Sequence, residues 1–245
     1  MKKVTISKNT TLHSDAFLDC HNLEEVYFDG DLAAWLELQF SESANPMFYA
    51  EKLYYKNNNE FVLLEEDLII PDGVTRIKSY AFNNFTSIKR VHIPTSVTSI
   101  EYFAFAGCNL LEEITIPNKV KKISTYAFYG CKSLKNVQFS NGLLEIGNNS
   151  FTGCNLLKEV VIPNTVTSLG AATFSNCTTL QKVVLSKNID SIGSRVFYNC
   201  KKLKSVTLPK TLKTLRYDTF RECVSLESIV IPEGVTKMDY RVFYQ

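Results

Sequence analysis

Six cysteines recur at an interval of 23 residues, and thiol chemistry makes them the first feature to interpret. They are Cys108, Cys131, Cys154, Cys177, Cys200 and Cys223. A zinc site needs four ligands that converge on one point, which a single file of evenly spaced thiols does not supply. Parallel side chains on stacked units also suit disulfides poorly. Phe85 fills the same repeat position in the first regular unit, so we predict reduced cysteines in an apolar core.

Histidines and acidic residues offer no stronger catalytic constellation. The three histidines are His13, His21 and His92. None has the H-x-x-x-H or H-E-x-x-H spacing of a metal site, and Cys20 beside His21 lies on a predicted bend, where neighbours seldom face each other. Glu65–Glu66 and Glu112–Glu113 are adjacent acids, which project to opposite faces of a strand. We therefore predict no enzyme activity, no metal and no cofactor.

The cysteine spacing belongs to a repeat that organises most of the chain. One column of the repeat is Pro71, Pro94, Pro117, Ser140, Pro163, Ser186, Pro209 and Pro232. Eleven residues after each lies a phenylalanine column: Phe82, Phe105, Phe128, Phe151, Phe174, Phe197, Phe220 and Phe243. A unit of 23 residues cannot bury its apolar face alone, so the copies are expected to stack as a solenoid.

Each unit is predicted to contain two short extended segments joined by bends. The first has the pattern L-x-x-V-x-I, as at residues 157–162, and a proline then ends the strand because it cannot donate to a ladder. The second has the pattern V-x-x-I, as at residues 120–123, and leads into Ala-Phe and a tight bend. We expect about nine or ten turns, and stacking at roughly 4.8 Å per turn predicts a solenoid roughly 45 Å long.

Residues 1–70 depart from the regular period and form a separate predicted unit, followed by one continuous solenoid over residues 71–245. The segment around Trp35 is expected to form a short helix that packs onto the first turns, and a hairpin is expected to turn at residues 57–59. The stretch at residues 14–28, with Phe17 and Cys20, reads as an early, degenerate copy of the repeat.

The pattern I-P-x-x-V-x-x-I-x-x-x-A-F-x-x-C-x-x-L-x-x-V resembles the BspA-like, Treponema-type leucine-rich repeat, and it runs unbroken over residues 71–245. Residues 31–71 resemble the irregular insert found within such arrays. The resemblance implies a right-handed, mainly β solenoid. It also implies a non-catalytic protein-binding scaffold, typical of interaction or adhesion modules at the cell surface.

The outward positions of the first extended segment form the first candidate binding surface. The residues assigned to it are Arg90, His92, Glu113, Gln138, Glu159, Val161, Lys182, Val184 and Val230. The three valines have two interpretations: ordinary β-propensity, or an apolar strip for a protein partner.

The charge distribution supplies a second candidate surface. Residues 1–72 contain five lysines and fourteen acidic residues, a net charge of −9, whereas residues 73–245 contain 22 basic and 11 acidic residues, a net charge of +11. The basic set comprises Lys132, Lys201, Lys202, Lys204, Lys210, Lys213 and Arg216. It is either a solvated surface or a docking surface for an acidic protein or nucleic acid. The alternative function is therefore an intracellular binder of nucleic acid or of a nucleoprotein enzyme.

The two ends of the sequence give further expectations. "MKKVTISKNTT" has no apolar segment behind its lysines and no run of 18 apolar residues follows, so we expect no signal peptide and no membrane insertion. This predicts a cytoplasmic protein, or a surface protein if the chain is part of a longer one. Val242 and Phe243 belong to core columns with no following unit to cover them. This predicts either that the chain is a fragment of a longer array or that it self-associates through the last turn.

Overall fold

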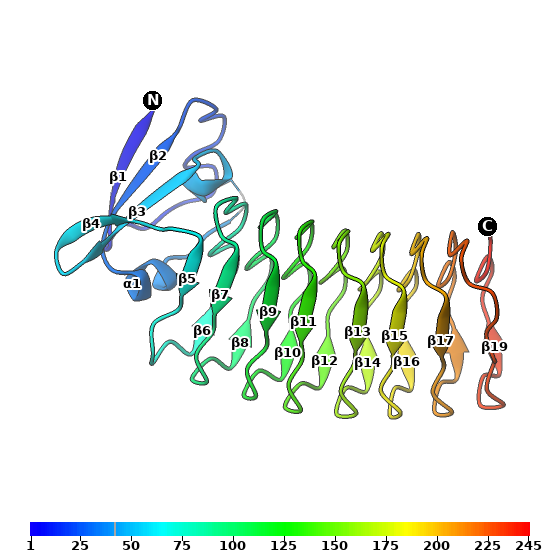
Figure 1. Cartoon of the computed structure of the whole chain (residues 1–245). Helices are drawn as coiled ribbons and strands as arrows, with labels where there is room; N and C mark the ends of the chain where they lie inside the picture. The colour runs from blue at the N-terminus through cyan, green and yellow to red at the C-terminus, as the bar shows by residue number, and fades with distance from the viewer. Residues whose placement is uncertain (42) are drawn as a thin grey trace.

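A computed structural model describes residues 1–41 and 43–245. The chain is a mainly β solenoid whose turns follow one another in a row, with an N-terminal unit set at an angle to one end (Figure 1). The N-terminal unit contains a sheet in the order β1–β2–β3–β4. Its strands are β1 (Lys3–Ser7), β2 (Glu25–Asp29), β3 (Lys52–Asn57) and β4 (Glu60–Leu63), and its helices are α1 (Leu32–Glu37) and the 3-10 helix η1 (Pro46–Phe48).

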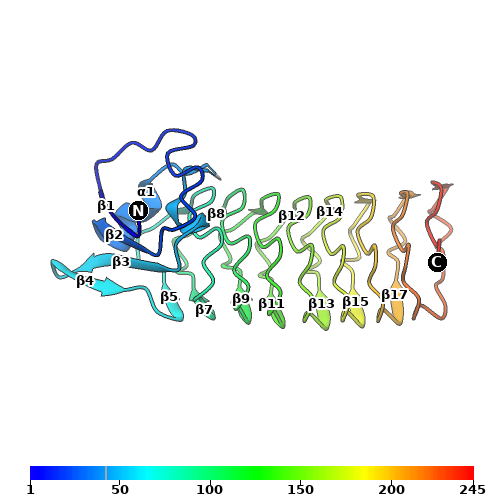
Figure 2. The same cartoon turned by 90° about the horizontal axis from the view of Figure 1, so that it is seen from above.

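Two ladders of parallel strands build the solenoid, and they run along opposite long sides of it (Figure 2). The first ladder contains β5 (Asp67–Ile69), β7 (Arg90–His92), β9 (Glu113–Thr115), β11 (Asn136–Gln138), β13 (Glu159–Val161), β15 (Lys182–Val184) and β17 (Ser205–Thr207). The second ladder contains β6 (Arg76–Ile77), β8 (Ser99–Ile100), β10 (Lys122–Ile123), β12 (Glu145–Ile146), β14 (Ser168–Leu169), β16 (Ser191–Ile192), β18 (Thr214–Leu215) and β19 (Lys237–Met238). Paired residues are one repeat apart, as in Glu159 opposite Lys182.

The bends at the phenylalanine column form a third set of hydrogen bonds between turns. The amide of Phe82 donates to the carbonyl of Ala104 at 2.9 Å, and Phe105 and Phe128 repeat this contact one and two turns later, at 2.8 Å each. Each bend needs a left-handed backbone residue two positions before its phenylalanine. These residues are Tyr80, Phe103, Tyr126, Asn149, Ala172, Arg195, Asp218 and Arg241. The same conformation at Asp15, two positions before Phe17, gives the early copy the same bend.

The phenylalanine column forms the centre of the core. Its rings from Phe82 to Phe220 are buried, and successive rings from Phe82 to Phe243 stack nearly parallel, with centroids 5.2 to 6.1 Å apart. The last ring, Phe243, is 40% exposed, whereas Val242 beside it is buried. The expectation that both residues lie uncovered is therefore wrong for Val242.

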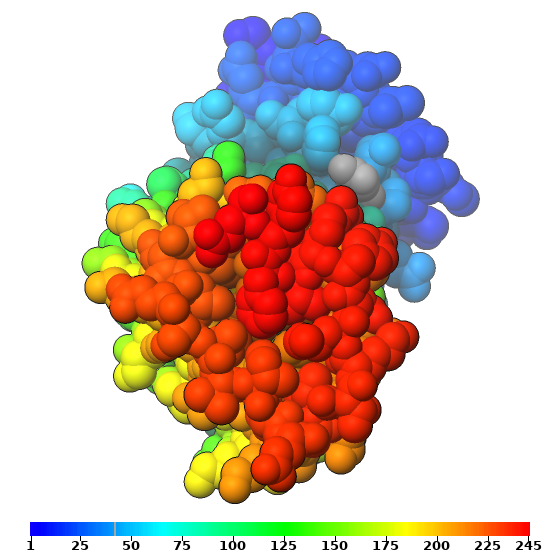
Figure 3. All heavy atoms as spheres, turned by 90° about the vertical axis from the view of Figure 1, so that its right-hand side faces the viewer, coloured from blue at the N-terminus to red at the C-terminus, as the bar shows by residue number. Residues whose placement is uncertain are grey.

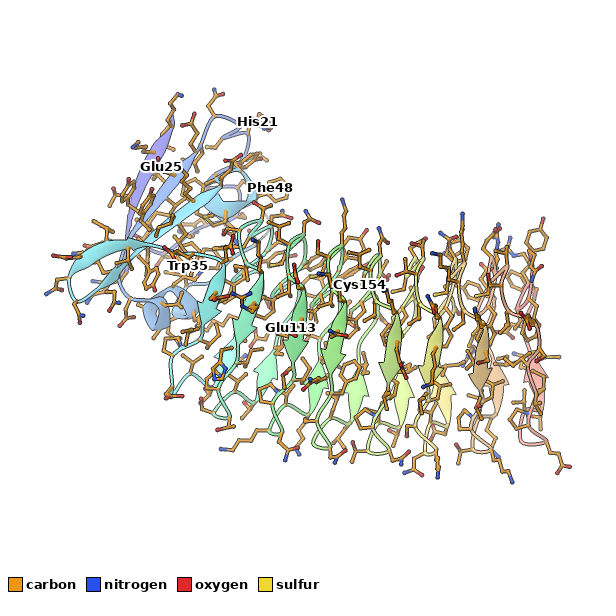
Figure 4. All side chains as sticks on the ribbon, viewed as in Figure 1. His21, Glu25, Trp35, Phe48, Glu113 and Cys154 are labelled. Atoms are coloured by element: carbon orange, nitrogen blue, oxygen red, sulfur yellow. The ribbon has the colours of Figure 1, made fainter. Side chains whose placement is uncertain are left out.

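The six aligned cysteines, which we call the cysteine column, are free and buried, as predicted. Each thiol donates a hydrogen bond to the carbonyl of the phenylalanine one turn earlier, at sulfur–oxygen distances of 3.0 to 3.5 Å. The site is thus apolar except for one backbone acceptor. A small hydrophobe with a weak donor suits both features, which explains why cysteine recurs there. Cys154, labelled in Figure 4, is one of the six.

Trp35 of α1 joins the N-terminal unit to the start of the array (Figure 4). Its indole is fully buried, and Nε1 donates to the carbonyl of Ala81 at 2.9 Å. Its ring meets Phe28 of the N-terminal unit and Phe85 of the array edge-to-face, at 5.3 and 6.2 Å. The β3–β4 hairpin turns at Asn58 and Asn59, which both have positive φ.

The regular pattern is interrupted at several places. Hydrogen bonding divides the second ladder between β16 and β18. It also divides the first ladder between β11 and β13, where Phe139 and Ser140 replace the usual aliphatic residue and proline. The expected strand at residues 228–230 does not form, and Val230 is 82% exposed in an irregular segment. No helix among the described residues is both long and apolar enough to cross a bilayer.

Candidate binding surfaces

The outward side of the first ladder carries the residues expected there. The strands alternate exposed, buried and exposed, as in β9, where Ile114 faces the core and Glu113 and Thr115 face solvent. The candidates Arg90, His92, Gln138, Glu159 and Lys182 are likewise exposed. All of these lie on one surface of the array because the strands that carry them stack side by side.

The early strands of this ladder enclose a shallow cavity of about 760 Å³, which we call the strand groove. It is lined by residues of β5, β7, β9 and β11, among them Ile69, Arg90, His92, Glu113 and Gln138. Ile69 is 66% exposed although it is a large aliphatic side chain. Figure 4 labels Glu113 in the middle of this region. The strand groove therefore combines an open apolar residue with acidic, basic and amide groups.

Ion pairs between neighbouring strands neutralise part of the charge on this surface. Arg90 lies 2.7 Å from Asp67, and Lys182 lies 2.7 Å from Glu159, each pair one repeat apart. The hydrogen bond from Arg90 to Asp67 raises the pKa of the arginine. Exposed pairs of this kind contribute little to stability. Of the two, the Arg90–Asp67 pair lies at the strand groove.

The predicted valine strip is short. Val161 and Val184 are exposed and in register on β13 and β15. The next residue in that row is Thr207, and Val230 lies outside any strand. The structure thus brings two of the three valines together.

The seven basic candidates are all exposed but occupy several repeat positions. Lys132, Lys201 and Lys202 follow the cysteine column, and Lys204 precedes β17. Lys210 lies in the bend after β17, whereas Lys213 and Arg216 flank β18. Within the described chain, none of the seven forms an ion pair. The structure therefore distributes this charge around the turns rather than on one face.

A second groove lies on the bends, away from both of the surfaces that the sequence predicts. It has a volume of about 420 Å³, and we call it the bend groove. Tyr126 and Tyr129 form one wall, and Arg195, Tyr198 and Arg221 form the other. The floor consists of smaller residues from the two turns between them, including Asn149, Thr152, Ala172 and Ser175. The alternation of bulky and small residues becomes evident only when the repeats are aligned at these bend positions.

The aligned cysteines and His21 lie outside both grooves. Across residues 1–41 and 43–245, no three histidine, cysteine or acidic side chains are placed to hold a metal ion. His21 lies 3.5 Å from Asp19 and against the ring of Tyr49. Burial raises the pKa of the thiols in the cysteine column, to about 12 for Cys131 and Cys177.

The ladders, the phenylalanine column and the open surfaces define a leucine-rich repeat scaffold. The family model for the BspA type leucine rich repeat region matches residues 54–179 and 144–245. The chain belongs to this family. A search of curated proteins found no significant match.

Several solved structures share the fold. A leucine-rich repeat protein from T. pallidum is 30% identical, with a TM-score of 0.58 over 71% of this chain and 73% of that one. A leucine-rich cell surface protein from Faecalibacterium prausnitzii is 26% identical, with a TM-score of 0.56 over 100% and 76%. The pneumococcal vaccine antigen PcpA, at 20% identity, shares the fold with a TM-score of 0.56 over 99% of this chain and 64% of its own.

Proposed function

We propose that the protein is a non-catalytic scaffold that binds a protein partner through the strand groove, as an interaction or adhesion module. The observation that carries this proposal is Ile69, an aliphatic side chain 66% exposed in a concave surface with Arg90, His92 and Glu113 around it. An apolar centre with a polar surround is typical of protein interfaces. One of the structures that share the fold, at 26% identity, is a leucine-rich cell surface protein, which supports a role in adhesion.

The first test places a photo-crosslinking residue at Thr115 in the strand groove and, as a control, at Lys122 on the opposite ladder. A partner that crosslinks from Thr115 only is identified and purified. Ile69→Asp and Glu113→Lys are then expected to weaken its binding by at least about tenfold each, or roughly 1.4 kcal/mol. Glu145→Lys on β12 should leave the affinity unchanged. Equal crosslinking from both positions, or unaltered affinity in the groove variants, would reject this surface.

The second candidate function is docking of nucleic acid or an acidic protein by the basic residues of the later turns. It is favoured by one observation: the seven basic candidates are exposed, and the described structure places no acidic partner beside them. Lys132 and Lys201 share a repeat position three turns apart, about 14 Å at the usual strand spacing. Their fields therefore add only partially at physiological salt, where the Debye length is about 8 Å.

We expect any such binding to weaken steeply with salt, because each neutralised phosphate releases counterions. Changing Lys201, Lys202 and Lys204 together to glutamate should abolish this binding. The protein should remain folded, because all three side chains are exposed. A salt titration of a single-stranded oligonucleotide, followed by fluorescence anisotropy, measures both effects. Glu24→Lys in the acidic N-terminal unit is the matched charge change and should not weaken binding. An oligonucleotide affinity that does not change with salt concentration, and that is unaltered in the triple lysine-to-glutamate variant, would exclude this function.

A further inference from the structure

We propose that the bend groove binds an acidic saccharide, with its carboxylate on the arginines and its ring against the tyrosines. The site is separate from the strand groove because it lies on the bends of the phenylalanine column rather than on the first ladder. The bends lie along the upper edge of the array in Figure 1, the edge at which the chain ends.

An aromatic stack ends at one wall of the bend groove. The rings of Tyr80, Phe103 and Tyr126 stack nearly parallel along successive bends, at 5.1 and 4.5 Å between centroids. The next residue in that column is Asn149, which cannot continue the stack. The outer face of Tyr126 is therefore turned toward the groove. Such a face suits the C–H bonds of a sugar ring, and Tyr129 beside it is exposed.

The opposite wall carries a positive cluster around a buried acid. Asp218 is fully buried, and its carboxylate lies 3.1 Å from Arg195 and 3.1 Å from Arg241. Arg221 is farther away, 3.9 Å from Asp218 and 3.8 Å from Glu222. Three guanidinium groups against two carboxylates leave the cluster at this wall with a net charge of +1, which matches one carboxylate rather than a polyanion. Of the three, Arg195 and Arg221 line the groove.

Arg221 is held in place but incompletely paired. Its guanidinium lies over the rings of Tyr198 and Tyr244, at 5.7 and 5.1 Å. Its Nε is buried without a hydrogen-bond acceptor in the described structure, and its side chain is 25% exposed at the groove. A guanidinium fixed between two rings is preorganised for a carboxylate, because its planar donors match two carboxylate oxygens.

The floor of the bend groove is long enough for a sugar, and it carries polar groups. Two turns of small residues separate the walls, so Tyr129 and Tyr198 are three turns apart, about 14 Å along the array. Amide and hydroxyl groups of Asn149, Thr152, Ser175 and Asn176 line this space. Asn199 donates to the Oδ1 of Asn176 at 2.7 Å, which holds that amide in position. These neutral groups suit sugar hydroxyls, and they favour a saccharide over an acid-rich peptide.

The repeat itself provides a variant that fills the groove. Ala172 has a φ of 54°, and Tyr126 occupies the equivalent position with a φ of 59°. Ala172→Tyr should therefore fold, because the array already accepts tyrosine in this backbone conformation. The new ring would occupy the floor between the two walls without removing any charged group.

The test is a titration of the full chain, followed by NMR or calorimetry, with a disaccharide that contains one glucuronic acid. The matched probes are the same disaccharide with glucose in its place and an acid-rich peptide. We expect the acidic disaccharide to bind at least about tenfold more tightly than either. Ala172→Tyr and Arg221→Gln should each weaken it by roughly tenfold or more. Lys122→Gln on the second ladder is the control and should have no effect.

Three outcomes would overturn the proposal: equal affinity for the neutral disaccharide, binding of the peptide alone, or undiminished binding by Arg221→Gln. The melting temperature of each variant shows whether it folds. If Ala172→Tyr does not fold, Arg221→Gln still tests the proposal. Binding of a protein partner by the strand groove should be unchanged in Ala172→Tyr, so failure of one site is distinguishable from failure of the other.

Discussion

Replacing Phe151 with alanine is expected to lower the free energy of unfolding by about 3–5 kcal/mol, the usual cost of removing a large buried side chain. The ring is fully buried and lies between Phe128 and Phe174, at centroid distances of 5.2 and 5.6 Å. Phe139 also meets it edge-to-face at 5.6 Å. Alanine would leave a cavity that stacked turns on both sides cannot close, because hydrogen bonds at the bend fix their spacing.

Phe243→Ala is the matched control, since it removes the same side chain from the same column. That ring is 40% exposed and, among the described residues, stacks on Phe220 alone. Its loss should cost less than about 1.5 kcal/mol, because part of the apolar surface is already in water. Urea denaturation followed by circular dichroism measures both variants. A cost for Phe151→Ala below about 1 kcal/mol, or equal to that of Phe243→Ala, would contradict the central role of the column.

The stacked core could be predicted from the sequence because the period is exact. A column such as Phe82 to Phe220 repeats without insertions, and equivalent residues of a solenoid must occupy equivalent positions on successive turns. The environment of the cysteines followed from Phe85, which showed that the position accepts a larger apolar side chain. The hydrogen bond from each thiol to a carbonyl of the preceding turn could not be foreseen, because it depends on the bend geometry.

The binding surfaces were less predictable than the core. Residues such as Arg90 and Asp67 form an ion pair across one repeat, and Lys182 and Glu159 do the same, so charge counted along the sequence overstates the free charge on that face. The bend groove exists because Asn149 and Ala172 are smaller than Tyr126 at the same repeat position. A small side chain does not stand out within a single repeat, so the groove is not evident from the sequence of one unit. The period alone predicts a strand at Val230, but this residue is exposed in an irregular segment.

The cysteine column should also make the protein labile at alkaline pH. Burial raises the pKa of these thiols above their ordinary value, to about 12 for Cys131, Cys177 and Cys223. In the unfolded chain a cysteine ionises near pH ~8.5. Below that pH both states keep the proton and stability is unaffected. Above it the unfolded state binds fewer protons than the native state, so stability falls as pH rises toward the folded pKa.

The expected size of this effect is large because several identical groups act together. Each buried thiol lowers stability by about 1.4 kcal/mol per pH unit once the unfolded form is ionised, or about 2 kcal/mol at pH 10. Three such thiols then remove about 6 kcal/mol, comparable with the whole stability of many domains. We expect the urea midpoint to be constant from pH 7 to 8 and to fall steeply from pH 8.5 to 10.

A double variant, Cys131→Ala and Cys177→Ala, separates this linkage from other alkaline effects. The two cavities should lower stability at pH 7, but removal of two titrating groups should make the decline above pH 9 shallower by about 2.7 kcal/mol per pH unit. Comparison below pH 9.5 avoids ionisation of the tyrosines, whose ordinary pKa is about 10. An array that keeps its pH 7 stability up to pH 9.5, or a double variant that declines as steeply as the parent, would show that these thiols are not buried in the folded protein.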